Sequence, residues 1–218
     1  MIKRELYMNR IRPFIGGELI KVMTGIRRSG KSVMLELIKE ELAEAGVAPS
    51  QMISINFEDM RYSHLQTATA LHDEIIKRAE GIEGKAYLFF DEIQEVEGWE
   101  KCVNSLRVAL DCDIYITGSN AKLLSGELAT YIGGRYVEFV IYPFSFAEFL
   151  ELYHTIAPSD SIQQCFQKYL LAGGMPYLAN LRYEEEPSRQ YLTDLFNSVQ
   201  LKDIVKRNKI RDIDLLSR

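Results

Sequence analysis

The stretch Gly25-Ile26-Arg27-Arg28-Ser29-Gly30-Lys31-Ser32 decides the fold. It matches the pattern G-x-x-x-x-G-K-[ST], in which the glycines let the backbone approach phosphate groups and backbone N–H groups enclose them. Residues 18–24 before it have the pattern of a strand, and residues 31–45 after it keep apolar side chains at helical spacing. This is the context that a phosphate-binding loop requires. We therefore expect the whole stretch to bind a polyphosphate, with Lys31 on the β- and γ-phosphates.

Two acidic residues form the second half of the predicted site. Asp91 and Glu92 follow the apolar run 86–90, which is typical of a strand buried on both faces of a parallel sheet. Such a strand delivers Asp91 to the carboxyl edge of the sheet, where it and the Ser32 hydroxyl are expected to hold Mg²⁺. Glu92 is then placed to accept a proton from an attacking water. A solvated acidic turn is the alternative, because further glutamates follow closely, but the upstream loop favours a catalytic pair.

Strands and helices alternate over the first two thirds of the chain. The expected strands are 18–24, 51–57, 86–90, 113–117 and 136–141. The expected helices between them are 31–45, 65–79 and 99–110. This alternation predicts an α/β fold with a parallel sheet between helical layers. After Pro143 the pattern is helical, with a capping box at residues 145–148 and further helices over 161–171 and from Pro187. We thus predict a core over residues 1–142 and a helical subdomain over 143–218, truncated at its C-terminal end.

Composition limits the remaining classes. A hydrophobic fraction of 47% and a charged fraction of 26% indicate a folded globular chain, and a net charge of −5 provides no overall attraction for nucleic acid. The three cysteines have no pairing or zinc-site spacing, and no signal peptide or membrane-spanning run is visible, so a soluble cytoplasmic protein is expected. A nucleic-acid motor stays open as an alternative because of small basic groups at Lys3, Arg4, Arg10, Arg12 and within 202–209.

Two further polar positions are candidates for the same chemistry. Asn120 follows the fourth expected strand in Thr117-Gly118-Ser119-Asn120 and is expected to reach the γ-phosphate or the water, with a helix cap as the alternative. Arg135 follows two glycines and opens the last strand. A planar, permanently charged arginine at that point is a candidate finger for the γ-phosphoryl group, supplied from a neighbouring subunit in a homo-oligomer. A structural ion pair with Glu138 is the alternative for Arg135.

Several motifs together resemble one family. These motifs are residues 20–32, Asp91-Glu92-Ile93-Gln94 with Trp99-Glu100, Thr117-Gly118-Ser119-Asn120, Gly134-Arg135 and residues 143–148. In this order they are similar to the prokaryotic AAA-type ATPases whose domain precedes a C-terminal domain of unknown function, relatives of the archaeal and STAND-type ATPases. The resemblance implies a three-layer P-loop sandwich with strand order 5-1-4-3-2, and it marks this chain as the N-terminal part of such a protein. It also implies that Pro176, in Gly173-Gly174-Met175-Pro176, touches adenine; a helix end followed by a stop is the alternative.

The function that these observations favour is Mg²⁺-dependent ATP binding and hydrolysis. Hydrolysis would drive a conformational change of the helical subdomain or of an unknown protein partner. The main alternative is a nucleotide-dependent switch or scaffold that binds ATP with negligible turnover. Glu92 and Asn120 favour the enzyme, because a binding module needs neither a general base nor a group that orients the water.

Overall fold

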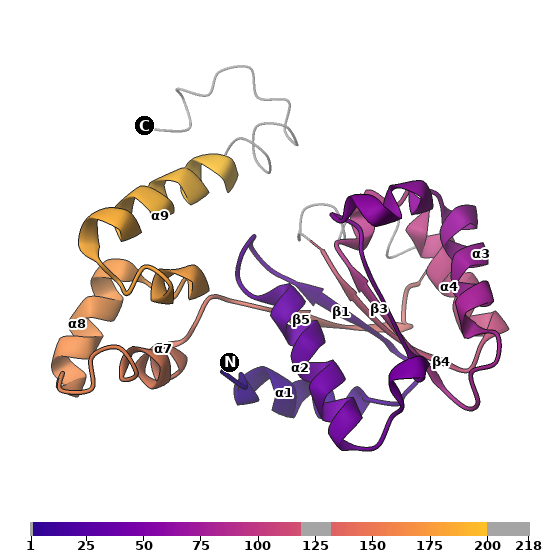
Figure 1. Cartoon of the computed structure of the whole chain (residues 1–218), viewed down its shortest axis with the longest axis horizontal. Coiled ribbons are helices and arrows are strands. Elements are labelled where there is room, and N and C mark those ends of the chain that lie inside the picture. Colours follow the sequence, from indigo (N-terminus) through magenta and orange to yellow (C-terminus); the bar gives the residue numbers. More distant parts are fainter. Residues whose placement is uncertain (1, 119–131, 200–218) are drawn as a thin grey trace. The chain divides into compact units, whose positions relative to one another are not determined.

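A five-stranded parallel sheet forms the centre of the first part of the chain (Figure 1). The computed structural model describes residues 2–118 and 132–199. The strands are β1 (Ile20–Thr24), β2 (Met52–Asn56), β3 (Ala86–Asp91), β4 (Cys112–Thr117) and β5 (Tyr136–Val140). They lie in the order β2-β3-β4-β1-β5, and every neighbouring pair is parallel. Counted from the other edge this is 5-1-4-3-2, so the predicted topology is confirmed.

Strand burial follows position in the sheet. Every residue of the inner strands β1 and β4 is buried, whereas β2 at one edge alternates between buried and exposed positions. Inner strands are covered on both faces, so they are apolar over most of their length, and an edge strand keeps a half-solvated pattern. The expected bounds of the strands are correct to within two residues.

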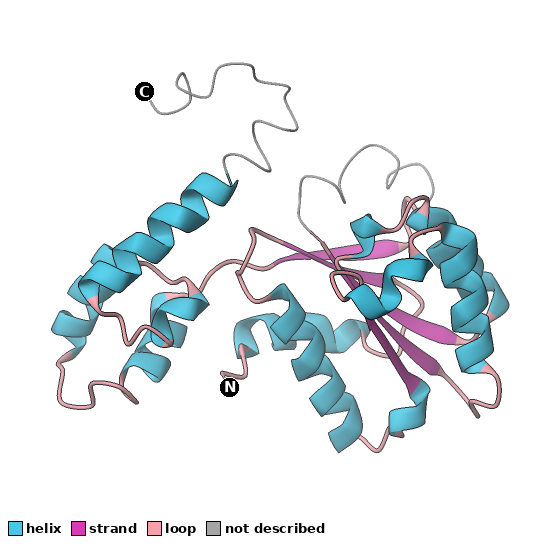
Figure 2. Cartoon of the chain, turned by 45° about the horizontal axis from the view of Figure 1, so that its top comes forward, coloured by secondary structure: helices cyan, strands magenta, loops and turns pink. Residues whose placement is uncertain are grey.

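Helices cover both faces of the sheet (Figure 2). Helices α1 (Glu5–Ile11) and α2 (Lys31–Glu44) pack against one face, with Met23 and Phe89 from the strands in the same core. Helices α3 (Ala68–Ala79) and α4 (Trp99–Ala109) pack against the other face, with Val22 and Phe90. Because adjacent strand residues point to opposite faces, Val22 and Met23 serve different cores. The result is the predicted sandwich of three layers.

The described residues from Tyr142 to Val199 group into a second unit, together with Ile2 and Arg27–Ser29. Its described helices are α7 (Phe146–Tyr153), α8 (Ile162–Ala172) and α9 (Glu185–Val199). The capping box predicted at the start of α7 is present: the Glu148 carboxylate accepts from the Ser145 amide at 2.8 Å. Phe149, Tyr153 and Tyr183 form an aromatic core with ring centroids 4.9–5.4 Å apart. Among the helices of the described residues, none is long and apolar enough to span a membrane.

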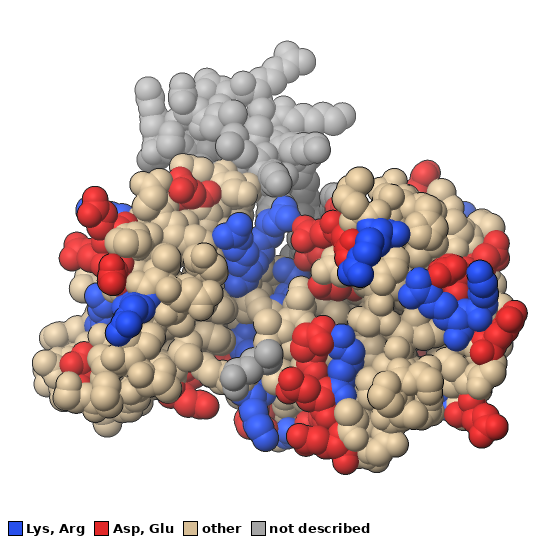
Figure 3. Space-filling model, viewed as in Figure 1, with Lys and Arg blue, Asp and Glu red and all other residues tan. Residues whose placement is uncertain are grey.

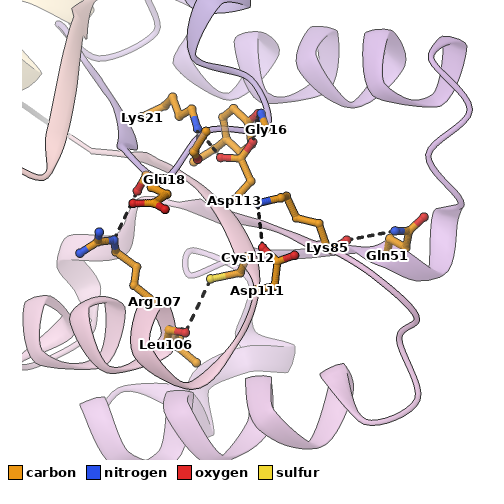
Figure 4. Close-up of polar contacts among 12 residues, drawn as sticks. Gly16, Glu18, Lys21, Gln51, Lys85, Leu106, Arg107, Asp111, Cys112 and Asp113 are labelled. Carbon is orange, nitrogen blue, oxygen red and sulfur yellow. Dashed lines mark hydrogen bonds and ion pairs between the residues drawn. The ribbon is translucent and has the colours of Figure 1, made fainter.

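A buried ion pair lies at the amino end of the sheet (Figure 4). Lys21 of β1 and Asp113 of β4 are both fully buried and contact each other. The other Asp113 oxygen accepts from the Tyr115 hydroxyl and from the Gly16 amide, each at 2.7 Å. Lys21 also donates to the Gly17 carbonyl at 3.1 Å. Burial lowers the pKa of Lys21, and Asp113 opposes that shift. The pair therefore joins two central strands and the turn that leads into β1.

We expect Asp113→Ala to reduce the free energy of unfolding by about 3–5 kcal/mol, because the substitution leaves the Lys21 ammonium buried without its counter-charge. Urea unfolding measures this loss. The matched control is Asp111→Ala: Asp111 is largely exposed and pairs with Lys85 at 2.7 Å, so its loss should cost less than about 1 kcal/mol. A double variant, Lys21→Met with Asp113→Leu, removes both charges and should lose less stability than Asp113→Ala. Equal losses in the two aspartate variants would contradict this account.

Candidate functional site

The phosphate loop connects the carboxyl end of β1 to the start of α2, as predicted. Gly25 and Gly30 have φ values of 139° and 100°, a region in which side chains are strained, so both glycines are required for this turn. The Lys31 ammonium is almost completely buried and donates to the Gly25 and Ile26 carbonyls at 3.3 and 3.2 Å. The Lys31 side chain therefore lies against the phosphate loop, and Lys31 itself is the first residue of a 14-residue helix. The backbone N–H groups at such a helix end attract anions.

Asp91 is the centre of a hydrogen-bonded cluster at the carboxyl edge of the sheet. One of its oxygens accepts from the Ser32 hydroxyl at 3.0 Å and from the Thr117 hydroxyl at 2.5 Å. The other accepts from the Asn56 amide at 3.0 Å. The expected proximity of Ser32 and Asp91 is therefore present. Asn56 and Thr117 are polar contacts that the sequence reasoning missed, although they end the strands β2 and β4 on either side of β3.

Glu92 lies beside Lys31 and has an unusual backbone. Its φ is 56°, in the left-handed region, which few residues other than glycine adopt. Its N–H donates to the Thr117 hydroxyl at 3.0 Å. One carboxylate oxygen lies 3.8 Å from the Lys31 ammonium, and the other accepts from the Gln94 amide at 2.5 Å. The side chain is 18% exposed, so water can still reach it. The structure thus brings together Lys31, Ser32, Asp91 and Glu92.

Arg135 does not join this cluster. It precedes β5, whose first residue pairs with Ile20 at the start of β1, so it lies at the amino edge of the sheet. Its guanidinium is exposed and donates to Asn104 of α4 at 2.8 Å. The expected alternative partner, Glu138, instead accepts from the Thr24 hydroxyl at 2.6 Å. Arg135 is therefore at the opposite edge of the sheet from the phosphate loop of its own chain.

The other predicted residues are placed as follows. Asn120 lies outside the described residues. Pro176 is the first residue of the 3₁₀ turn Pro176–Ala179 in the second unit. The nearby Gly174 has a structural role, because a Cβ there would lie 2.0 Å from the Phe144 carbonyl oxygen.

Two arginines lie within the phosphate loop. Arg28 is exposed with a φ of 63°, and Arg27 is half-buried. Their contacts with a nucleotide stay predictions.

Two proteins with related sequences align with most or nearly all of this chain. An uncharacterized protein of Haemophilus influenzae is 41% identical over 217 residues, which are 99% of this chain and 54% of that protein. An uncharacterized protein of Methanocaldococcus jannaschii is 34% identical over 203 residues, which are 89% of this chain and 44% of that protein. The chain thus spans about half the length of the curated relatives it matches.

Solved structures share the fold. AMPPCP-bound DnaA from Aquifex aeolicus aligns with a TM-score of 0.53 at 14% identity, covering 95% of this chain and 66% of DnaA. A mutant of Thermotoga maritima RuvB aligns with a TM-score of 0.54 at 14% identity, covering 93% of this chain and 69% of RuvB. At this identity the likeness concerns the fold alone.

A family model described as an AAA domain matches residues 18–150, which include the phosphate loop and the acidic pair. The chain therefore belongs to the AAA domain family of P-loop ATPases.

Proposed function

We propose that this domain binds ATP with Mg²⁺ and hydrolyses it. The observation that carries the proposal is the meeting of two pairs at one sheet edge: Ser32 with Asp91 at 3.0 Å, and Lys31 with Glu92 at 3.8 Å. A phosphate-binding cation, hydroxyl and carboxylate donors for a hard metal ion, and a second carboxylate for water are the groups that this reaction needs.

The donor set fits magnesium. Ser32 and Asp91 offer hydroxyl and carboxylate oxygens within hydrogen-bond distance of each other, and Mg²⁺ is usually held by one or two carboxylates together with substrate phosphates and water. When bound, the ion would neutralise charge on the β- and γ-phosphate oxygens. Asn56 and Thr117 hold the Asp91 carboxylate from both sides, so its orientation is fixed before any ion arrives.

The remaining chemistry belongs to Lys31 and Glu92. Lys31 would exchange the two loop carbonyls for phosphate oxygens, which are stronger partners for an ammonium. With the Lys31 ammonium bound to the phosphates, the Glu92 carboxylate would no longer face that positive charge. It would then accept a proton from the attacking water. A module that only binds nucleotide has no need for this carboxylate.

Arg12, one of the basic residues on which the nucleic-acid alternative rests, gives it no support, and residues 202–209 lie outside the described residues. Arg12 is paired with Glu5 at 2.7 Å and with Glu41 at 2.9 Å, so acidic neighbours offset its charge. Over the sheet unit in Figure 3, basic and acidic side chains alternate instead of forming a basic surface of one sign. A phosphate backbone would meet both signs on this face.

We expect Lys31→Ala to abolish tight ATP binding while the fold is retained, because the substitution removes the cation that the loop aims at the phosphates. Isothermal titration calorimetry with ATP and Mg²⁺ measures the affinity, and thermal unfolding checks the fold. The matched control is Lys39→Ala, on the same helix, where the ammonium pairs with Glu36 at 2.6 Å. Wild-type affinity in Lys31→Ala would contradict the assignment of the phosphate loop, whereas Lys39→Ala should bind ATP normally.

A further inference from the structure

The two oxygens of the Glu92 carboxylate have different partners. Lys31 approaches one oxygen at 3.8 Å, and the Gln94 amide donates to the other at 2.5 Å. In the proposed reaction Lys31 moves its charge to the phosphates. Gln94 is then the described side chain that continues to hold Glu92.

Gln94 is rigidly placed for this contact. It lies in the 3₁₀ turn Ile93–Glu95, which the Glu95 amide closes by donating to the Glu92 carbonyl at 3.1 Å. Ile93 is fully buried in the core between the sheet and α3 and α4, so it anchors the turn. The left-handed backbone of Glu92 is fixed in turn by its bond to Thr117. The backbone positions from which the two side chains meet are therefore fixed.

Glu92 determines the orientation of the Gln94 amide. The Gln94 carbonyl oxygen is buried and has no hydrogen-bond partner among residues 2–118 and 132–199. An orientation with that oxygen toward Glu92 would bring an acceptor against a carboxylate, so the NH₂ group must face Glu92. A buried acceptor without a partner is unfavourable, and the arrangement persists because the charge-assisted bond on the other side of the amide compensates.

We propose that Gln94 is a positioning residue that holds the Glu92 carboxylate in the orientation needed to activate water. The inference rests on the proposed function, because it assigns Glu92 the role of general base. Gln94 itself touches neither the nucleotide nor the water in this proposal. Its effect should therefore appear in the rate of the chemical step and not in nucleotide affinity.

The test uses Gln94→Met in the full-length protein, because methionine keeps the length of the side chain and removes the donor. We expect kcat to fall about ten- to a hundredfold and KM to change less than about threefold, since a lost hydrogen bond to a charged group is worth this much in rate. The matched control is Gln51→Met. Gln51 is also half-buried and also donates through its amide, to the Lys85 carbonyl at 3.0 Å at the other end of the strands (Figure 4). The Gln51→Met variant should retain wild-type kcat.

A double-mutant cycle separates positioning from a general structural effect. If Gln94 acts through Glu92, Gln94→Met should lower kcat no further in a Glu92→Gln background. A further loss of the same size in that background, an unchanged kcat in the single variant, or a raised kcat would each overturn the proposal. Should Gln94→Met fail to fold, Gln94→Leu also removes the donor with a side chain of similar volume, so it should show the same loss of kcat.

The outcomes also separate this inference from the proposed function. No ATP turnover by the wild-type protein would overturn both. Turnover that depends on Glu92 but is unchanged in Gln94→Met would overturn the role of Gln94 alone.

Discussion

Glu92→Gln is expected to bind ATP as tightly as the wild-type protein and to hydrolyse it at least about a hundredfold more slowly, with losses of up to about 10⁴-fold typical of a general base. Glutamine keeps the size of the side chain and its bond to Gln94 through one oxygen, but it cannot accept a proton from water. The binding groups Lys31, Ser32 and Asp91 are untouched. The loss should therefore fall on the chemical step.

Single-turnover release of phosphate measures that step, and calorimetry measures the affinity. The matched control is Glu95→Gln, which removes an exposed carboxylate from the same turn and should leave turnover unchanged. Wild-type turnover in Glu92→Gln would assign the proton transfer to another group. Tight binding with negligible turnover in the wild-type protein itself would support the nucleotide-dependent switch instead.

The parts of the fold predicted from the sequence are those that depend on local patterns. The phosphate loop needs glycines at Gly25 and Gly30 because the backbone has positive φ at both, so its pattern is visible in any sequence that contains it. Asp91 was predicted because an apolar strand ends at it. Neither periodicity nor spacing determines which strands are neighbours, so the strand order was predicted from the family resemblance. The structure confirms that order.

The parts that were missed depend on pairing between distant segments. Asn56 and Thr117 meet Asp91 because β2 and β4 flank β3, and the pattern within one strand does not show which side chains the neighbouring strands bring to it. The buried pair of Lys21 and Asp113 was missed because a charged residue in a strand pattern normally indicates an exposed position, and each partner lies on a different strand. Helix α1 was missed because it has seven residues and no side-chain cap at its start.

The location of Arg135 makes the finger hypothesis more specific. Arg135 lies at the amino edge of the sheet, and the phosphate loop of the same chain follows the carboxyl end of β1. A contact with its own γ-phosphate would therefore have to cross the length of the sheet. The guanidinium is exposed and donates to Asn104 at 2.8 Å. We propose that any catalytic action of Arg135 is on the nucleotide of a neighbouring copy.

We expect Arg135→Ala to lower turnover about 10³–10⁵-fold, the range for arginine fingers, with ATP affinity retained.

Mixing the Lys31→Ala and Arg135→Ala proteins tests whether the arginine acts in trans. Lys31→Ala and Arg135→Ala should each be inactive alone, whereas an equal mixture should recover about a quarter of wild-type activity, because about one interface in four then pairs an intact loop with an intact arginine. Arg107→Ala, which removes a partly exposed arginine from the helix that carries Asn104, is the matched control and should be active. A mixture that co-assembles without recovery would exclude action in trans, and full activity of Arg135→Ala would exclude the finger, leaving Arg135 as the surface partner of Asn104.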